Sequence, residues 1–161
     1  QDDDGCPEGD ADGDGFFDSE DACKDEAETV NGFKDGDGCK DAVPDDLQAV
    51  LGIRADVRFK QGKAEMRRAA KETDALAEVL KKYGEDVEIV IAATAHKVKD
   101  ADALALERAE GFKAALVERG VPEKMLSVRS LGARELPENP PKGARNDRIE
   151  LQIKVKQQGA K

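Results

Sequence analysis

From Ile53 onward the apolar residues recur with regular spacing, which predicts alternating strands and helices. Apolar and polar residues alternate over 53–59 and again over 148–156, as expected of strands with one face in a core. Residues 87–94 are almost continuously apolar and β-branched, which indicates a buried strand. Residues 125–131 are predicted to form another strand, which lies between the strands 87–94 and 148–156 in the sequence.

Two segments between these strands have helical spacing. Apolar residues recur at three- and four-residue steps from Met66 to Tyr83, and Gly84 is placed to end that helix. A second helix is expected over residues 101–119, with Gly120 and Pro122 beyond its end. Residues 132–147 contain three prolines and are predicted to be a long loop over one end of the sheet. The order strand, helix, strand, helix, strand, loop, strand predicts one compact domain of helices and strands.

The first 46 residues lack this periodicity and carry a different charge. They contain 18 acidic residues and three lysines, whereas the rest of the chain has 23 basic and 18 acidic residues. Their few large apolar side chains cannot form a core that offsets the conformational entropy of folding. We therefore divide the chain into an acidic segment, 1–46, and a domain, 47–161, and expect the acidic segment to need other stabilising links.

The spacing of carboxylates in the acidic segment indicates a calcium loop. Positions one, three, five, nine and twelve of such a loop fall on aspartates, and Gly15 falls at position six, where the chain must turn. Anions this close repel one another unless a hard divalent cation lies between them. No amphipathic helix precedes the loop, so it differs from an EF-hand. The alternative is an acidic, solvated, disordered linker.

An internal repeat suggests how the cysteines are arranged. The stretch 2–8 matches 35–41 at an offset of 33 residues. Cys23 and Cys39 bracket a loop that a disulfide would close, although free thiols or a metal site are the alternative. Zinc is disfavoured because there is no CxxC spacing and His96, the only histidine, lies in the other part of the chain.

Cys6 is then left over. By the repeat it should pair with a cysteine upstream of Gln1, so we expect the chain to be a fragment of a longer protein. A disulfide also implies an oxidising compartment, such as a bacterial periplasm or the cell exterior.

The acidic segment resembles a thrombospondin type 3 calcium repeat. The resemblance covers residues 1–46 and lies in the D-x-D-G-D-G stretch, in Asp21-Ala-Cys23 and in the stretch from Asn31 to Cys39. It implies a chain with almost no regular secondary structure that is coated with Ca²⁺. The ligands that it implies are Asp10, Asp12, Asp14, the carbonyl of Phe16, Asp18, Asp21, Asn31, Asp35, Asp37 and Asp41.

The domain resembles the OmpA C-terminal domain, the peptidoglycan-associating module of Gram-negative outer-membrane proteins and lipoproteins. The similar stretches are 59–65, 76–80, 104–109 for the family's L-S-x-x-R-A, and 146–150 for its N-R-R-V-E. The resemblance implies an α+β fold with helices on a mixed sheet. It also places the protein in the periplasm, at the outer membrane or on the cell surface of a Gram-negative bacterium.

The resemblance further implies a site for the diaminopimelate end of a peptidoglycan stem peptide. In the family an Asp binds its ammonium and an Arg its carboxylate. Here Ala95 takes the place of that Asp, Ala101 of an Asn, and Asp147 of the first Arg of N-R-R-V-E. Losing the Asp should weaken binding roughly ten- to a hundredfold. The site residues that the resemblance implies are Thr94, Arg108, Asn146 and Arg148.

Two acids could replace the missing one. Asp100 or Asp102 would face the site if the loop before the second helix turned inward. We favour the alternative, in which both cap and solvate the start of that helix.

The remaining function classes are disfavoured. No nucleophile stands in a recognisable catalytic setting, there is no glycine-rich phosphate loop, and His96 on a polar loop is expected to be solvated, so we expect no enzyme. The acidic segment would repel nucleic acid, and no apolar run is long enough to span a membrane. Two hypotheses remain. The first is a peptidoglycan tether with a calcium-stabilised spacer, and the second is a degenerate domain that does not bind peptidoglycan and serves as a structural scaffold or binds another envelope protein.

Overall fold

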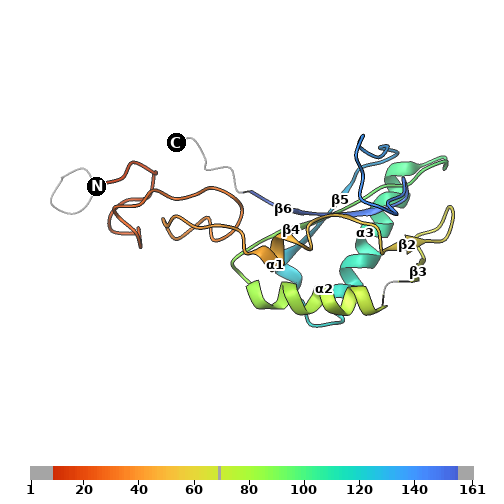
Figure 1. Cartoon of the computed structure of the whole chain (residues 1–161), viewed down its shortest axis with the longest axis horizontal. Helices are drawn as coiled ribbons and strands as arrows, with labels where there is room; N and C mark the ends of the chain where they lie inside the picture. Colours follow the sequence, from red (N-terminus) through yellow and green to blue (C-terminus); the bar gives the residue numbers. More distant parts are fainter. Residues whose placement is uncertain (1–8, 69, 156–161) are drawn as a thin grey trace. The chain divides into compact units, whose positions relative to one another are not determined.

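The computed structural model describes residues 9–68 and 70–155 (Figure 1). The described chain divides into two units, residues 9–44 together with Val155, and residues 45–154. The first repeat stretch, 2–8, lies outside the described residues, so the pairing of Cys6 stays a prediction.

Residues 9–44 contain no helix and no run of strand (Figure 1). Aspartate side chains hold the turns instead. Asp10 Oδ1 accepts a hydrogen bond from the backbone N–H of Gly13 at 2.8 Å, and Asp14 Oδ1 accepts one from Phe16 at 2.8 Å. The disulfide between Cys23 and Cys39 is confirmed, with Cα atoms 5.0 Å apart.

Four strands form the main sheet of the second unit, in the order β1-β6-β4-β5. They are β1 (Gly52–Arg54), β4 (Ile89–Ala93), β5 (Leu126–Ser130) and β6 (Ile149–Ile153). β6 is antiparallel to both β1 and β4, and β4 is parallel to β5, so the sheet is mixed, as predicted. Ile91 lies opposite Leu151 of β6 and Val128 of β5, which places these apolar side chains on one face.

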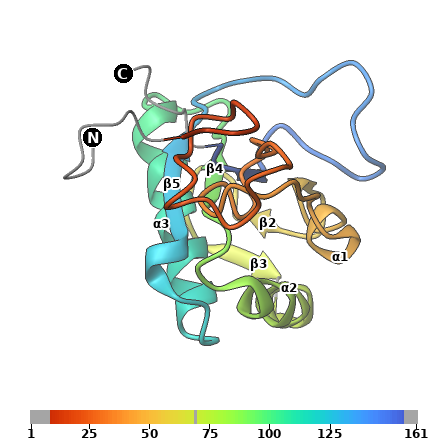
Figure 2. The same cartoon turned by 90° about the vertical axis from the view of Figure 1, so that its left-hand side faces the viewer.

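The helices cover that face. α2 (Ala70–Tyr83) and α3 (Ala101–Val117) contact each other at an angle, and α3 packs on β4 and β5 (Figures 1 and 2). A short helix α1 (Asp45–Gln48) precedes the sheet, and a 3₁₀ turn η1 (Glu123–Met125) leads into β5. Gly84, with φ of 43°, follows the end of α2 as predicted. Among the described residues, the large apolar side chains without exposed surface are those of Leu47, Leu80, Ile89, Ile91, Leu116 and Ile149.

Two details of the first strand and helix were predicted wrongly. The expected strand over 53–59 is broken by a turn at 55–56, and its second half is β2 (Arg58–Phe59). β2 pairs with β3 (Met66–Arg68) in a separate hairpin, so Met66 lies in a strand rather than in the first turn of a helix. Pairing between two short strands decided this conformation over the local helical spacing. Ala69, also expected in the helix, lies outside the described residues.

Residues 131–148 form a long irregular connection between β5 and β6, as predicted. Among the described residues, no helix combines the length and apolarity needed to cross a membrane.

The disulfide leads to a first prediction. Replacing Cys23→Ala together with Cys39→Ala should lower the stability of residues 9–44 by about 3 kcal/mol, because the bond closes a loop with a sequence separation of 16. Hydrogen exchange of the amides in 9–44, followed in increasing urea, measures this change, and the amides of β4 serve as the internal control. Unchanged exchange in 9–44 would show that the disulfide does not stabilise the segment.

Candidate functional site

Asp100 and Asp102, the two acids that could have replaced the family's acid at position 95, both make other contacts at the start of α3. Asp100 caps the helix, because its Oδ1 accepts a hydrogen bond from Ala103 N at 3.0 Å. Asp102 Oδ1 accepts one from Ser130 Oγ of β5 at 2.7 Å. The capping interpretation is therefore confirmed for Asp100, and Asp102 is engaged with the sheet rather than with the site.

Arg108 is the centre of the candidate site, although its side chain is completely buried. Its Nε donates to the Lys63 carbonyl at 3.0 Å, and its Nη1 donates to the Thr94 carbonyl at 2.8 Å. The guanidinium carbon lies 4.6 Å from the centre of the Phe59 ring, within the range of a cation–π contact. Nη2 is buried and has no hydrogen-bond partner among the described residues.

The acid that faces this guanidinium is Asp147. Its Oδ1 lies 3.0 Å from Arg108 Nη1 and also accepts a hydrogen bond from His96 N at 2.6 Å. Sequence reasoning recorded Asp147 only as the loss of a family arginine. The structure shows that the same residue restores an acid beside Arg108, while Ala95, at the family's Asp position, is completely buried.

Thr94 and Asn146 hold the long loop against the end of β4. The buried Thr94 Oγ1 donates to the Asn146 carbonyl and accepts a hydrogen bond from Arg148 N at 3.0 Å. The Asn146 side chain accepts one from Leu136 N at 3.1 Å, within the loop. These contacts fix the position of Asp147, which lies between the two loop residues that Thr94 binds.

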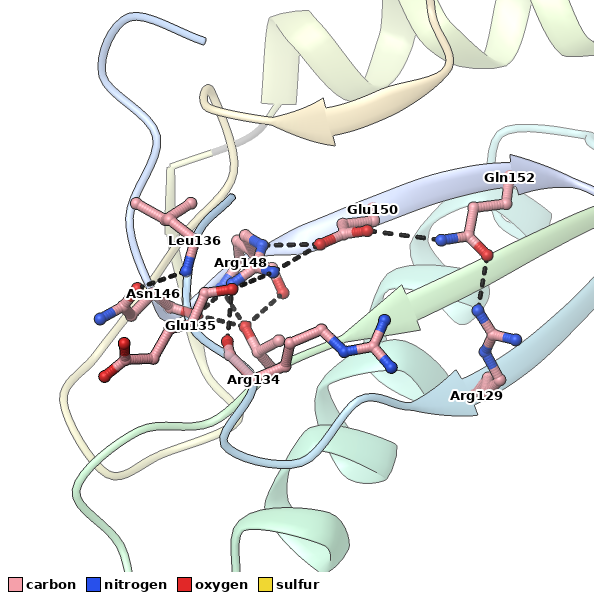
Figure 3. A network of polar contacts seen from close by, with 9 residues as sticks. Arg129, Arg134, Glu135, Leu136, Asn146, Arg148, Glu150 and Gln152 are labelled. Carbon is pink, nitrogen blue, oxygen red and sulfur yellow. Dashed lines mark hydrogen bonds and ion pairs between the residues drawn. The ribbon is translucent and has the colours of Figure 1, made fainter. Parts of the chain in front are cut away.

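The Arg148 guanidinium extends the same network into the long loop, and its Nη1 donates to the Asn146 carbonyl at 3.2 Å (Figure 3). Its guanidinium pairs with Glu150 at 2.7 Å and donates to the carbonyls of Arg134 and Glu135. Successive strand residues point to opposite faces, so Arg148 and Glu150 share the face opposite the buried Ile149. The structure thus brings Thr94, Asn146 and Arg108 together but turns the Arg148 guanidinium toward the loop.

A cavity of about 400 Å³ opens beside Asp147. Its walls come from three segments: residues 58, 59, 61 and 67 of the β2–β3 hairpin, residues 96 and 97 after β4, and residues 145–147 of the long loop. Phe59 and Asp147 therefore contact both the cavity and Arg108. His96 also lines it and is only partly exposed, with Nε2 buried and unpartnered among the described residues, contrary to the expectation that it is solvated.

Carboxylates gather at two places in the acidic segment. One oxygen each from Asp10, Asp12 and Asp14 lies within 4.8 Å of the others. Asp12 Oδ2 is buried and has no hydrogen-bond partner among the described residues. Desolvation raises the pKa of the Asp12 carboxyl, and repulsion from the neighbouring aspartates raises it further. A hydrogen bond from the Asp14 backbone N–H lowers this pKa but does not cancel the rise. A hard cation would satisfy these oxygens, so the residues present fit Ca²⁺.

The second cluster contains Glu28, Asp37 and Asp41. Glu28 Oε1 and Asp41 Oδ2 are both buried without a partner in the described part of the chain, so this set also fits a cation. Burial, followed by repulsion from Asp41 and Asp37, raises the pKa of Glu28. Sequence reasoning missed Glu28 because it stands outside the aspartate-glycine pattern.

The other calcium candidates lie outside these two carboxylate clusters. Asp18, Asp21 and Asp35 accept hydrogen bonds from backbone N–H groups within the segment, and Asn31 donates to Asp41 Oδ1 at 2.9 Å. Their roles as ligands, and that of the Phe16 carbonyl, stay predictions.

Comparison with known proteins identifies the domain. Residues 58–150 match the OmpA family over more than half of the chain, so the chain belongs to the OmpA family. No match is found among curated proteins.

Solved structures share the fold. The C-terminal domain of Helicobacter pylori MotB is 19% identical, with a TM-score of 0.54 over 66% of this chain and 89% of the MotB chain. The periplasmic domain of the same protein is 17% identical, with a TM-score of 0.53 over 66% and 75% of the two chains. The peptidoglycan-associated lipoprotein from Burkholderia pseudomallei is 22% identical, with a TM-score of 0.51 over 68% and 93%. These similarities confirm the mixed α+β fold.

The burial of Arg108 leads to a second prediction. Arg108→Met should lower the free energy of unfolding by about 3 kcal/mol, because it leaves Asp147 and two carbonyls without their charged partner. Urea denaturation measures the change. Arg134→Met, which removes an exposed arginine side chain from the long loop, is the matched control and should change stability by less than about 0.5 kcal/mol. Equal stability of the two variants would contradict a supporting role for Arg108.

Proposed function

We propose that residues 47–161 associate with peptidoglycan in the envelope of a Gram-negative bacterium, through the cavity beside Arg108. The observation that carries this proposal is the ion pair between Arg108 and Asp147, which puts an acid and an arginine at one site in a member of the OmpA family. A structural neighbour is named a peptidoglycan-associated lipoprotein, and others are periplasmic domains. A binding role agrees with these neighbours better than a catalytic one.

Asp147 is suited to bind the ammonium of a diaminopimelate residue. Its side chain is 28% exposed and lines the cavity. Only Oδ1 is engaged by Arg108 and His96, and Oδ2 has no hydrogen bond to any residue that the structure describes. A ligand ammonium could therefore bind Oδ2 through a charge-assisted hydrogen bond.

This arrangement should bind less tightly than an unpaired aspartate would. Arg108 lies 3.0 Å from Asp147 and offsets part of its negative charge before any ligand arrives. In addition, Arg108 is completely buried, so a ligand carboxylate reaches it only if Phe59 or the loop moves. The proposed function is thus modest binding to the stem peptide with altered contacts.

The burial of Arg108 and Ala95 also supports the second hypothesis. A domain in which both family positions are inaccessible could serve as a structural or protein-interaction scaffold without binding peptidoglycan. Binding to purified sacculi separates the two functions.

The third prediction concerns retention on sacculi. We expect the full chain to sediment with purified peptidoglycan. Asp147→Asn should bind about tenfold more weakly and so reduce the retained fraction, because a neutral amide loses the charge-assisted contact. Glu138→Gln removes an exposed acid of the same loop outside the cavity and should leave retention unchanged.

Circular dichroism of each variant shows that the fold is intact. Absence of wild-type retention would favour the scaffold, whereas retention that is equal in Asp147→Asn would place the contact outside this cavity.

We also propose that the acidic segment is a thrombospondin type 3-like spacer that binds Ca²⁺. Its two carboxylate clusters contain buried oxygens without partners, and its lack of helix and strand leaves metal ions and the disulfide as its main stabilising links. The carboxylates of Asp10, Asp12 and Asp14 would hold one ion, and those of Glu28, Asp37 and Asp41 another.

The fourth prediction tests this metal binding. Removal of Ca²⁺ with a chelator should lower the melting temperature of the segment and speed its hydrogen exchange, since the clustered carboxylates would then repel one another. Asp12→Asn should weaken binding measured by titration calorimetry, and Asp25→Asn, an exposed acid outside both clusters, should not. A melting temperature that does not respond to chelator would contradict the proposal.

A further inference from the structure

The walls of the cavity beside Asp147 are strongly basic. Arg58, Arg67, Lys97 and Arg145 all line it, and Asp147 is the one acid among the lining residues. Asp147 is already paired with Arg108. None of the four cations forms an ion pair with another residue in the described part of the chain, in contrast to Arg54, Arg108, Arg119 and Arg148.

These cations come from three separate segments of the fold. Arg58 and Arg67 stand on the two strands of the β2–β3 hairpin, Lys97 follows β4, and Arg145 belongs to the long loop. Lys97 has φ of 56°, a backbone conformation that few residues other than glycine adopt. Like charges converging on one concave surface repel one another, and an anionic ligand would relieve that repulsion.

The size of the cavity suits a small part of a larger ligand. Its volume of about 400 Å³ lies within the range of about 300–1,000 Å³ that small-molecule sites occupy. Three of the four lining cations are arginines, whose planar guanidinium binds a carboxylate through two parallel hydrogen bonds. Arg58 Nη2 also donates to the Gly143 carbonyl at 3.4 Å, whereas no hydrogen bond from the other three side chains occurs in the described part of the chain. The cavity therefore offers several basic side chains that could bind carboxylates of a ligand. These surround one acidic side chain, Asp147, which is suited to bind an ammonium group of the ligand.

We propose that this cavity selects peptidoglycan stem peptides by their free carboxylates, and that Arg58, Arg67, Lys97 and Arg145 take over the contact that the buried Arg108 cannot make. The inference rests on the proposed function and specifies its ligand. Stem peptides with unmodified glutamate and diaminopimelate carboxyl groups would bind, and stem peptides in which these groups are amidated would bind poorly.

Two soluble muropeptides test this selectivity. Fluorescence anisotropy with the full chain compares a labelled muropeptide that has free carboxyl groups with the same compound after amidation. We expect the free acid to bind at least about tenfold more tightly, as the loss of one charge-assisted contact implies. Raising the salt concentration should reduce this difference, because the cations at the rim are screened.

Arg145 offers the cleanest variant, because its side chain is exposed and has no partner among the described residues. Arg145→Gln should weaken binding of the free acid and leave binding of the amidated form unchanged, and Arg145→Lys should restore part of the loss. Arg129→Gln removes the same charge from β5, outside the cavity, and should alter neither affinity.

The possible failures are distinguishable. Equal affinity of the wild-type chain for the two muropeptides would overturn the carboxylate selectivity and leave the proposed function standing. Absence of binding to both muropeptides and to sacculi would overturn the proposed function as well. Competition by inorganic phosphate as effective as that by the free acid would also overturn the inference, because it would reveal a cationic surface that does not select carboxylates.

Discussion

The buried guanidinium of Arg108 constrains the whole site. A charge without access to water is costly unless it is paired and hydrogen-bonded. Arg108 meets this requirement only when the β2–β3 hairpin supplies the Lys63 carbonyl, the end of β4 supplies the Thr94 carbonyl and the long loop supplies Asp147. Three segments that are distant in the sequence are thereby held around one side chain of α3. The cavity lies where these segments meet, so its shape depends on the same interaction.

This constraint determines which charges of the site are used within the protein. Position 95 carries an alanine, and the acid beside Arg108 is supplied by Asp147 of the long loop. Once Arg108 is satisfied from within the protein, it becomes part of the supporting structure. The other positive charges around the cavity lie further out, on the hairpin and the loops, where we propose that they meet a ligand.

The acidic segment is stabilised on a different physical basis. The domain buries a continuous apolar core between its helices and its sheet, whereas residues 9–44 rely on aspartate-held turns and one disulfide. Buried carboxylate oxygens without partners would be unfavourable in any core, and in this segment they mark where cations fit. We therefore expect the two parts of the chain to respond to different conditions: the segment to metal and redox state, and the domain to loss of packing.

The sequence alone determined the elements that depend on local periodicity, namely α3, most of α2, and the strands β4, β5 and β6, together with the disulfide and the family. The alternation of Arg148 and Ile149 indicated that they lie on opposite faces, but it did not indicate that Arg148 is buried as well. Only the tertiary structure decided that Met66 joins a hairpin and that Asp147 faces Arg108. Both depend on contacts between residues far apart or on pairing between strands, and the spacing of side chains along one segment carries no information about such partners.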